Sequence, residues 1–176
     1  MRHLKFATGT ASLLFTIPFF AQEGIDLSGT WQMDGSRSAS AHQAVPIGPV
    51  VLVIKQTAVE LRIETRRSEK GKSAASTETL TFTLDGVESS VLGNYGGQVK
   101  LKAHWDGAKL IAETTRNIQD ATVSTVQVFS LDAKGKELTV DKTLTIQHGY
   151  QSPGANNNNV GRGTDVFVRG KASAKK

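Results

Sequence analysis

The sequence predicts an all-β fold, an antiparallel up-and-down meander closed into a barrel of about 8–9 strands. Three observations support this prediction. Short runs of alternating apolar and polar residues recur along most of the chain, as expected of half-buried strands. Glycine-containing turn signals separate several of these runs. No stretch of adequate length has helical periodicity, and the long crossovers that parallel strands need are missing.

The alternation defines the strands in chain order. They are expected at Leu27–Met33, Val50–Thr57, Val59–Arg66, Thr77–Leu84, Gln98–Trp105, Lys109–Arg116, Ala121–Leu131, Glu137–Gln147 and Thr164–Arg169. Asp85-Gly86, Asp106-Gly107 and Lys134-Gly135-Lys136 lie between consecutive runs and favour hairpins. A meander of this length leaves exposed edges unless it closes on itself, so a barrel is the economical solution. A two-sheet sandwich is the alternative.

The chain begins with a segment typical of a secretory signal. Residues 1–21 combine a basic start, an apolar stretch and a small final residue, Ala21. An uncleaved membrane anchor is the alternative, but Pro18 interrupts the apolar stretch, which is shorter than the about 20 residues of a span. We expect a secreted or periplasmic mature protein without a membrane span. Its organisation is predicted as a barrel domain over 22–170, long loops at 34–49 and 150–163, and a basic disordered tail at 171–176.

The composition argues against several classes of function. The chain has 176 residues and no cysteine, which excludes disulfides, thiolate metal sites and a cysteine nucleophile. Its formal net charge is +5, but the charges alternate along the strands and aromatic residues are scarce, so no nucleic-acid partner is expected. The four histidines form no metal-ligand motif, and no Gly-x-Ser-x-Gly turn occurs. We therefore expect no metal, no cofactor and no catalysis.

An early Gly-x-Trp motif, Gly29-Thr30-Trp31 preceded by Leu27, resembles the opening of lipocalins and their calycin relatives. The resemblance implies that Gly29 and Trp31 are structural, that Trp31 fills one barrel end, and that a late basic residue, Arg169, packs across it. The chain also resembles a group of uncharacterised secreted bacterial lipocalin-like domains, through segments 27–31, 52–56, 85–88, 105–110 and 134–140. This resemblance implies a lipocalin-like barrel and an export route, but no ligand. The Thr-Asp-Tyr motif of standard lipocalins is not visible.

Three strands place a cation on their apolar face. Because side chains alternate between the two faces of a strand, Arg67, Arg116 and Lys142 should point into the barrel. They share that face with apolar residues, among them Leu110, Leu138, Val140 and Leu144. An unpaired buried cation is costly, so a carboxylate, water or a ligand must accompany it. The alternative is that Arg67 and Arg116 reach solvent from strand ends, and that a β-bulge turns Lys142 outward.

The interior cations favour a binding site for an anionic amphiphile. Intracellular fatty-acid binders, which belong to the same broad class of barrels, hold an acid headgroup with interior arginine. We expect Arg116 and Lys142 to form a positive site at one depth, with an acyl chain along Leu110, Leu138, Val140 and Leu144. Lys142→Met would then weaken acid binding and stabilise the empty protein.

The predicted function is that of an exported, non-catalytic protein that binds a small apolar or anionic amphipathic ligand, such as a fatty acid. The alternative is an extracytoplasmic protein-interaction or structural module whose core is filled by side chains. The size of the interior cavity distinguishes the two, because ligand pockets have volumes of about 300–1,000 Å³.

Overall fold

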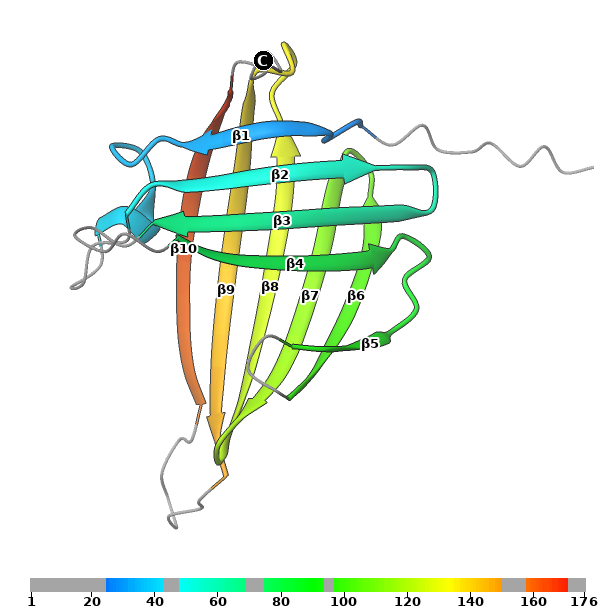
Figure 1. Ribbon diagram of the computed structural model, residues 1–176, viewed down its shortest axis with the longest axis vertical. Coiled ribbons are helices and arrows are strands. Elements are labelled where there is room, and N and C mark those ends of the chain that lie inside the picture. The colour runs from blue at the N-terminus through cyan, green and yellow to red at the C-terminus, as the bar shows by residue number, and fades with distance from the viewer. Residues whose placement is uncertain (1–24, 43–47, 69–74, 94–96, 150–157, 171–176) are drawn as a thin grey trace, which may run out of the picture.

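The computed structural model describes residues 25–42, 48–68, 75–93, 97–149 and 158–170, and these form one antiparallel sheet of ten strands (Figure 1). The strands are β1 (Gly29–Met33), β2 (Val50–Gln56), β3 (Glu60–Ser68), β4 (Ala75–Thr83), β5 (Ser89–Leu92), β6 (Gln98–Asp106), β7 (Lys109–Ile118), β8 (Ala121–Leu131), β9 (Glu137–His148) and β10 (Asn158–Arg169). A short 3₁₀ helix, η1 (Ala39–His42), follows β1.

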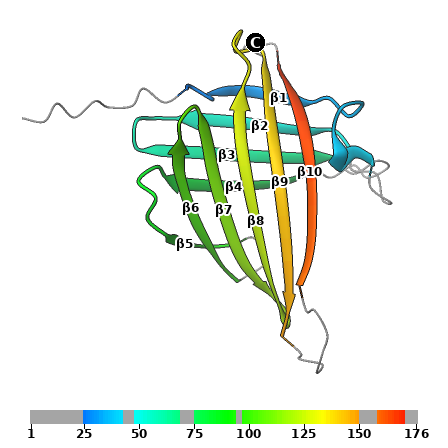
Figure 2. The ribbon, with the colours of Figure 1, turned by 180° about the vertical axis from the view of Figure 1, so that it is seen from behind.

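The sheet curls into a nearly closed barrel. Its strand order is β4-β3-β2-β1-β10-β9-β8-β7-β6-β5, so the first strand pairs with the last. Strands β1 to β4 cross β6 to β10 steeply in Figure 1 and, from behind, in Figure 2, as in orthogonal packing of two sheet halves. The two ends of this order, β4 and β5, do not pair, and we call the opening between them the seam. The predicted antiparallel meander is confirmed, and it curls into a nearly closed barrel.

The predicted count of about 8–9 strands is too low. The strand that was missed, β5, has only four residues, too few to display a clear alternation. In addition, β10 begins at Asn158, so the predicted loop 150–163 is wrong over residues 158–163. These residues pair continuously with β9, from Asn158↔Gln147 to Gly163↔Lys142. Asparagine and glycine have low strand propensity, so pairing with β9 and not the local sequence makes this segment a strand. Residues 150–157 lie outside the described part of the chain.

Two of the three predicted hairpins are confirmed. Gly107 joins β6 to β7 and Gly135 joins β8 to β9, with φ values of 57° and 65°. The hairpin predicted at Asp85-Gly86 is wrong, because β4 and β5 are not neighbours in the sheet. The amide of Gly86 instead donates to the carbonyl of Ala103 in β6, at 3.0 Å. Within the predicted loop 34–49, residues 39–42 form η1 and residues 43–47 are not described.

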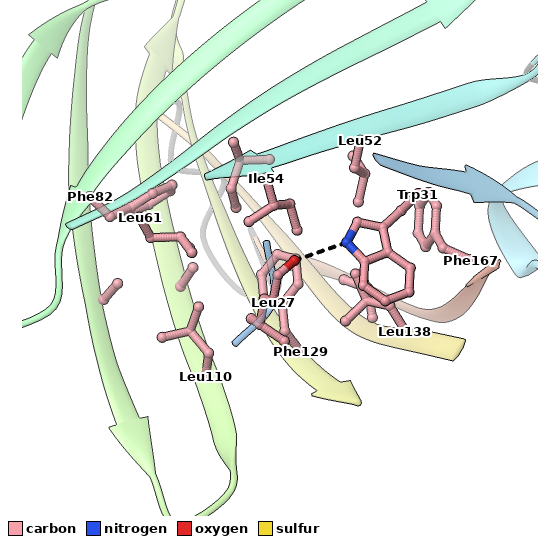
Figure 3. Close-up of a cluster of buried hydrophobic side chains, with 14 of the residues drawn as sticks. Leu27, Trp31, Leu52, Ile54, Leu61, Phe82, Leu110, Phe129, Leu138 and Phe167 are labelled. Carbon is pink, nitrogen blue, oxygen red and sulfur yellow. Dashed lines mark hydrogen bonds between the residues drawn. The ribbon is translucent and has the colours of Figure 1, made fainter. Parts of the chain in front are cut away.

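A packed apolar core occupies the part of the barrel around Trp31. Figure 3 shows this core, with its contributing side chains drawn from strands on both halves of the barrel. Trp31 is fully buried, and its Nε1 donates a hydrogen bond to the carbonyl of Leu27 at 2.9 Å. The largest fully buried side chains include Trp31, Phe82, Phe129, Phe167, Leu61, Leu110 and Leu138. This core fixes the strands whose continuations form the site described next.

Candidate ligand-binding cavity

The inward-facing side chains change from apolar to polar in the same direction on neighbouring strands. In order they are Leu61-Ile63-Thr65-Arg67 on β3, Phe82-Leu80-Glu78-Ser76 on the paired strand β4, and Leu110-Ala112-Thr114-Arg116 on β7. We call the end with Arg67 and Arg116 the polar end of the barrel, and the end with Leu61 and Leu110 the apolar end. An amphipathic molecule could match this gradient along its own length.

A cavity of about 320 Å³ lies where the lining changes from apolar to polar side chains, and we call it the main cavity. Its apolar wall comes from Leu52, Ile63, Leu80, Phe82 and Phe129. Its polar wall comes from Thr65, Ser76, Thr77, Thr114, Thr125 and Gln127, and its charged groups are Arg67, Glu78, Arg116 and Lys142. A smaller cavity of about 130 Å³ shares Leu52, Thr65, Arg67, Gln127 and Lys142 with it. The barrel interior is therefore not filled by side chains at this level.

The three cations predicted from strand parity, Arg67, Arg116 and Lys142, all line the main cavity. The registers of β9 with β8 and with β10 run without interruption past Lys142, so no bulge turns it outward. Parity thus placed these residues correctly, and contact of any of them with a ligand stays a prediction.

Arg116 is paired with an interior carboxylate. Its Nη1 donates to Oε1 of Glu78 at 2.6 Å, and solvent reaches only 24% and 15% of the two side chains. Arg67 approaches the other oxygen of Glu78, with 4.0 Å between Nη1 and Oε2, and its side chain is 45% exposed. One carboxylate therefore serves two arginines unequally. Glu78 was overlooked as a site residue, although it has the same parity as Leu80 and Phe82 on its strand.

Lys142 pairs with a fully buried carboxylate, that of Asp165 on β10. The same carboxylate accepts hydrogen bonds from the amide of Ser40, at 3.0 Å, and from its hydroxyl, at 2.6 Å. Burial by itself raises the pKa of Asp165, but the hydrogen bonds from Lys142 and Ser40 outweigh burial and hold the pKa below its ordinary value of 3.8. Asp165 is therefore an anion that fixes Lys142 and η1 to the same strand. Its parity with Phe167 was the sequence signal for an interior position.

Arg116 and Lys142 lie at different register positions of the strands that carry them. Arg116 is opposite Val123, which is opposite Ile146 on β9, whereas Lys142 is opposite Gln127, which is opposite Ala112 on β7. Four positions of β9 thus separate the two register positions, about 13 Å along a strand at 3.3 Å per residue. Because the strands of a barrel are tilted, this offset does not give the difference in depth, and a common depth stays a prediction. Parity gives the face of a strand but not the register between strands, so it could not give relative depth.

The apolar residues proposed for an acyl chain are distributed differently. Leu110 and Leu138 are fully buried in the core and do not line the main cavity. Val140 lines the smaller cavity. Leu144 is 38% exposed and lies beside Lys142 in an open recess near the polar end. The apolar surface available to a ligand in the main cavity comes instead from β2, β3, β4 and β8, including the aromatic rings of Phe82 and Phe129.

The first and last strands meet as the Gly-x-Trp resemblance implies. Trp31 is paired with Arg169 across β1 and β10, and the guanidinium carbon lies 4.2 Å from the centre of the indole ring. Gly29 has a φ of 148°, and a Cβ at this position would lie 2.6 Å from Nη1 of Arg169. A side chain at position 29 would thus displace the arginine. This joint, in a nearly closed antiparallel barrel, has the arrangement that the resemblance to lipocalins implies.

Across the described segments, no three His, Asp or Glu side chains are grouped so that they could hold a metal ion. The helical structure in these segments is too short to cross a membrane. The arrangement brings together an apolar wall, hydroxyl groups and charged side chains around one cavity, which is suited to reversible binding.

Comparisons with known proteins bear on the fold alone. No protein-family model and no curated protein matches the chain. Among solved structures, it is similar to the REP1-NXSQ fatty acid transporter, with 14% identity, a TM-score of 0.49, and coverage of 84% of this chain and 98% of that chain. It is also similar to apo lipid binding protein 8 of Caenorhabditis elegans, with 12% identity, a TM-score of 0.49, and coverage of 82% and 95%. A biotin binding protein from chicken has 15% identity, a TM-score of 0.38, and coverage of 83% and 97%. At these identities and TM-scores, no ligand is carried over to this chain.

Proposed function

We propose that this protein is a non-catalytic binding protein for a small amphipathic molecule with an anionic group. The ligand lies in the main cavity with its apolar part against Phe82 and Phe129, and with its anionic group toward Arg67 at the polar end. The observation that carries the proposal is the main cavity itself, about 320 Å³ in volume and graded from apolar to charged. Its size falls in the range of ligand pockets. A cavity of this size favours ligand binding over the interaction-module alternative, which requires an interior filled by side chains.

A titration with matched amphiphiles tests the proposal. The full chain is titrated with decanoate, below its micelle concentration, and with decanol, below its solubility limit, and heat release is measured by calorimetry. We expect saturable binding of both with one site per chain, and tighter binding of decanoate because hydrogen bonds to charged groups are stronger than neutral ones. Absence of binding by either compound would contradict the proposal. If binding is observed, native mass spectrometry of protein purified from its own source would identify the natural ligand.

Export is a separate part of the proposal, based on the signal-like character of residues 1–21. The mature protein should begin near Gln22 and be found in the periplasm or outside the cell. N-terminal sequencing of protein from fractionated cells tests this, and an intact Met1 on cytoplasmic protein would contradict it.

A further inference from the structure

The main cavity carries an incomplete balance of charge. Among the described residues, its charged side chains are three cations and Glu78, and Asp165 behind Lys142 supplies a second carboxylate. Asp165 is fully buried and saturated by Lys142 and Ser40, so it neutralises one cation. Glu78 neutralises a second. One positive charge around the cavity is therefore left without a carboxylate of its own.

The geometry locates this charge at Arg67. Arg116 forms the short contact with Glu78, at 2.6 Å, whereas Arg67 lies 4.0 Å from the same carboxylate. Arg67 is also the most exposed of the three cations, at 45% of its side chain, and it lines both the main cavity and the smaller one. A guanidinium in this position can turn to an incoming anion without breaking a strong existing pair.

Glu78 limits what that anion can be. A ligand group bound by Arg67 lies near a carboxylate that is 15% exposed, where like charges repel more strongly than in water. A single negative charge completes the balance, whereas a second one would face Glu78 with no free cation to receive it. Selectivity commonly depends on such a repulsive element as well as on attraction.

We infer that the main cavity selects amphiphiles with one negative charge, that Arg67 binds their headgroup, and that Glu78 is the specificity-determining residue that rejects doubly charged headgroups. This inference rests on the proposed function, because it assumes that the main cavity binds an amphiphile. It narrows the ligand to the class of monoanions, such as carboxylates, sulfonates or sulfate esters, and excludes phosphate monoesters at neutral or higher pH.

Octyl sulfate and octyl phosphate test the inference, because their headgroups share a tetrahedral shape and differ in charge. At pH 8 the phosphate monoester is close to a dianion, since its second pKa is about 6, while the sulfate ester carries one charge. Octanol supplies the uncharged reference. We expect the full chain to bind octyl sulfate at least about tenfold more tightly than octyl phosphate, a factor that corresponds to about 1.4 kcal/mol.

Glu78→Gln should reduce this preference by about tenfold or more, chiefly by improving the binding of octyl phosphate, because Arg116 then becomes available to the second charge. The amide oxygen of glutamine can still accept from Arg116, which protects the fold, and thermal unfolding checks this. Glu64→Gln is the matched control, since Glu64 pairs with Arg66 at 2.6 Å on the outer surface and should leave both affinities unchanged. Arg67→Gln provides an independent arm and should remove the preference for octyl sulfate over octanol.

The outcomes distinguish failure of the proposed function from failure of the monoanion selectivity. If the wild-type protein binds none of the three compounds, the proposed function fails. If it binds octyl sulfate and octyl phosphate equally, or if Glu78→Gln changes both affinities by the same factor, the proposed function stands and the inference is overturned. If Glu78→Gln does not fold, an unchanged sulfate preference in Arg67→Gln overturns the inference as well.

Discussion

Arg169 covers the ring of Trp31 at the joint between the first and last strands, with 4.2 Å between the guanidinium carbon and the ring centre. The same guanidinium donates to the carbonyl of Ser28 at 2.8 Å and to the carbonyl of Gly135 at 2.8 Å. One side chain thereby ties together β1, the β8–β9 turn and β10. Because the pairing of β1 with β10 joins strands β1–β4 to strands β5–β10 in one sheet, this cluster stabilises the junction between the two halves of the barrel.

Trp31→Ala should destabilise the protein by about 3–5 kcal/mol, because it removes a fully buried aromatic side chain and leaves a cavity. Urea unfolding measures the loss. Trp105→Ala is the matched control, since Trp105 is only partly buried against the core, and its effect should be smaller. A Trp31→Ala variant as stable as the wild type would show that the indole does not support the joint.

Gly29→Ala should destabilise the protein by about 1–3 kcal/mol. The new methyl group would lie 2.6 Å from Nη1 of Arg169, on a backbone with a φ of 148°. In an Arg169→Ala background the contact is relieved and only the backbone strain is left, so the cost should fall. A double-mutant cycle by urea unfolding measures this coupling. Gly161→Ala, with open space around its Cβ position, should be nearly neutral, and additive effects of Gly29→Ala and Arg169→Ala would contradict the interpretation.

The strands that were predictable from sequence are those rich in β-branched residues or in apolar residues at alternating positions. The prediction for β8 matches the observed strand at both ends, Ala121–Leu131, because β-branched residues fill it. The start of β10 was not predictable, since its order comes from pairing with β9. The seam was not predictable either, because Asp85-Gly86 has the local character of a hairpin turn, while the chain there crosses to β6.

The candidate site was predictable only as far as a single strand determines it. A period of two is a property of one strand, so it placed Arg67, Arg116 and Lys142 inside the barrel. Their pairing with Glu78 and Asp165 depends on which strands face each other and in which register, and a single sequence does not contain that information. Strand parity alone therefore indicates charge in the interior but not its balance.

Lys142→Met should destabilise the empty protein, in contrast to the stabilisation expected from sequence. Lys142 is the cationic partner of Asp165, so its removal leaves a fully buried carboxylate without its counter-charge. A loss of about 3 kcal/mol is expected for breaking such a pair. The double variant Lys142→Met with Asp165→Asn should recover part of the loss, because both charges are then gone. Equal stability of the wild type and Lys142→Met would show that Ser40 alone satisfies Asp165.

Asp165→Asn should have an effect that depends on pH. The folded protein holds the pKa of Asp165 below its ordinary value of 3.8, so the carboxylate contributes stability that is fully present well above pH 3.8. This contribution is lost as the pH falls below 3.8 and passes through the lowered pKa. The difference in unfolding free energy between the wild type and Asp165→Asn should thus be constant above about pH 5 and shrink below about pH 4. A difference that does not change with pH would contradict the assignment.

The ion pair between Arg116 and Glu78 connects β7 to β4, which are not neighbours in the sheet. It therefore holds the free edge of β4 to the opposite half of the barrel near the seam. Arg116→Met should cost about 2 kcal/mol, less than the 3–5 kcal/mol of a fully buried pair, because solvent reaches part of both side chains. Hydrogen exchange at the backbone amides of β4 should accelerate, because this strand has only β3 as a sheet partner.

Arg66→Met is the matched control for this change. Arg66 pairs with Glu64 at the same distance of 2.6 Å, but on the outer surface, where solvent reaches 54% and 25% of the two side chains. Such a pair is worth at most about 1 kcal/mol, and its loss should leave exchange in β4 unchanged. If both variants lose the same stability and their β4 amides exchange at the same rate, the interior pair does not hold the seam. The packing of β4 against β6 is then sufficient to close the barrel.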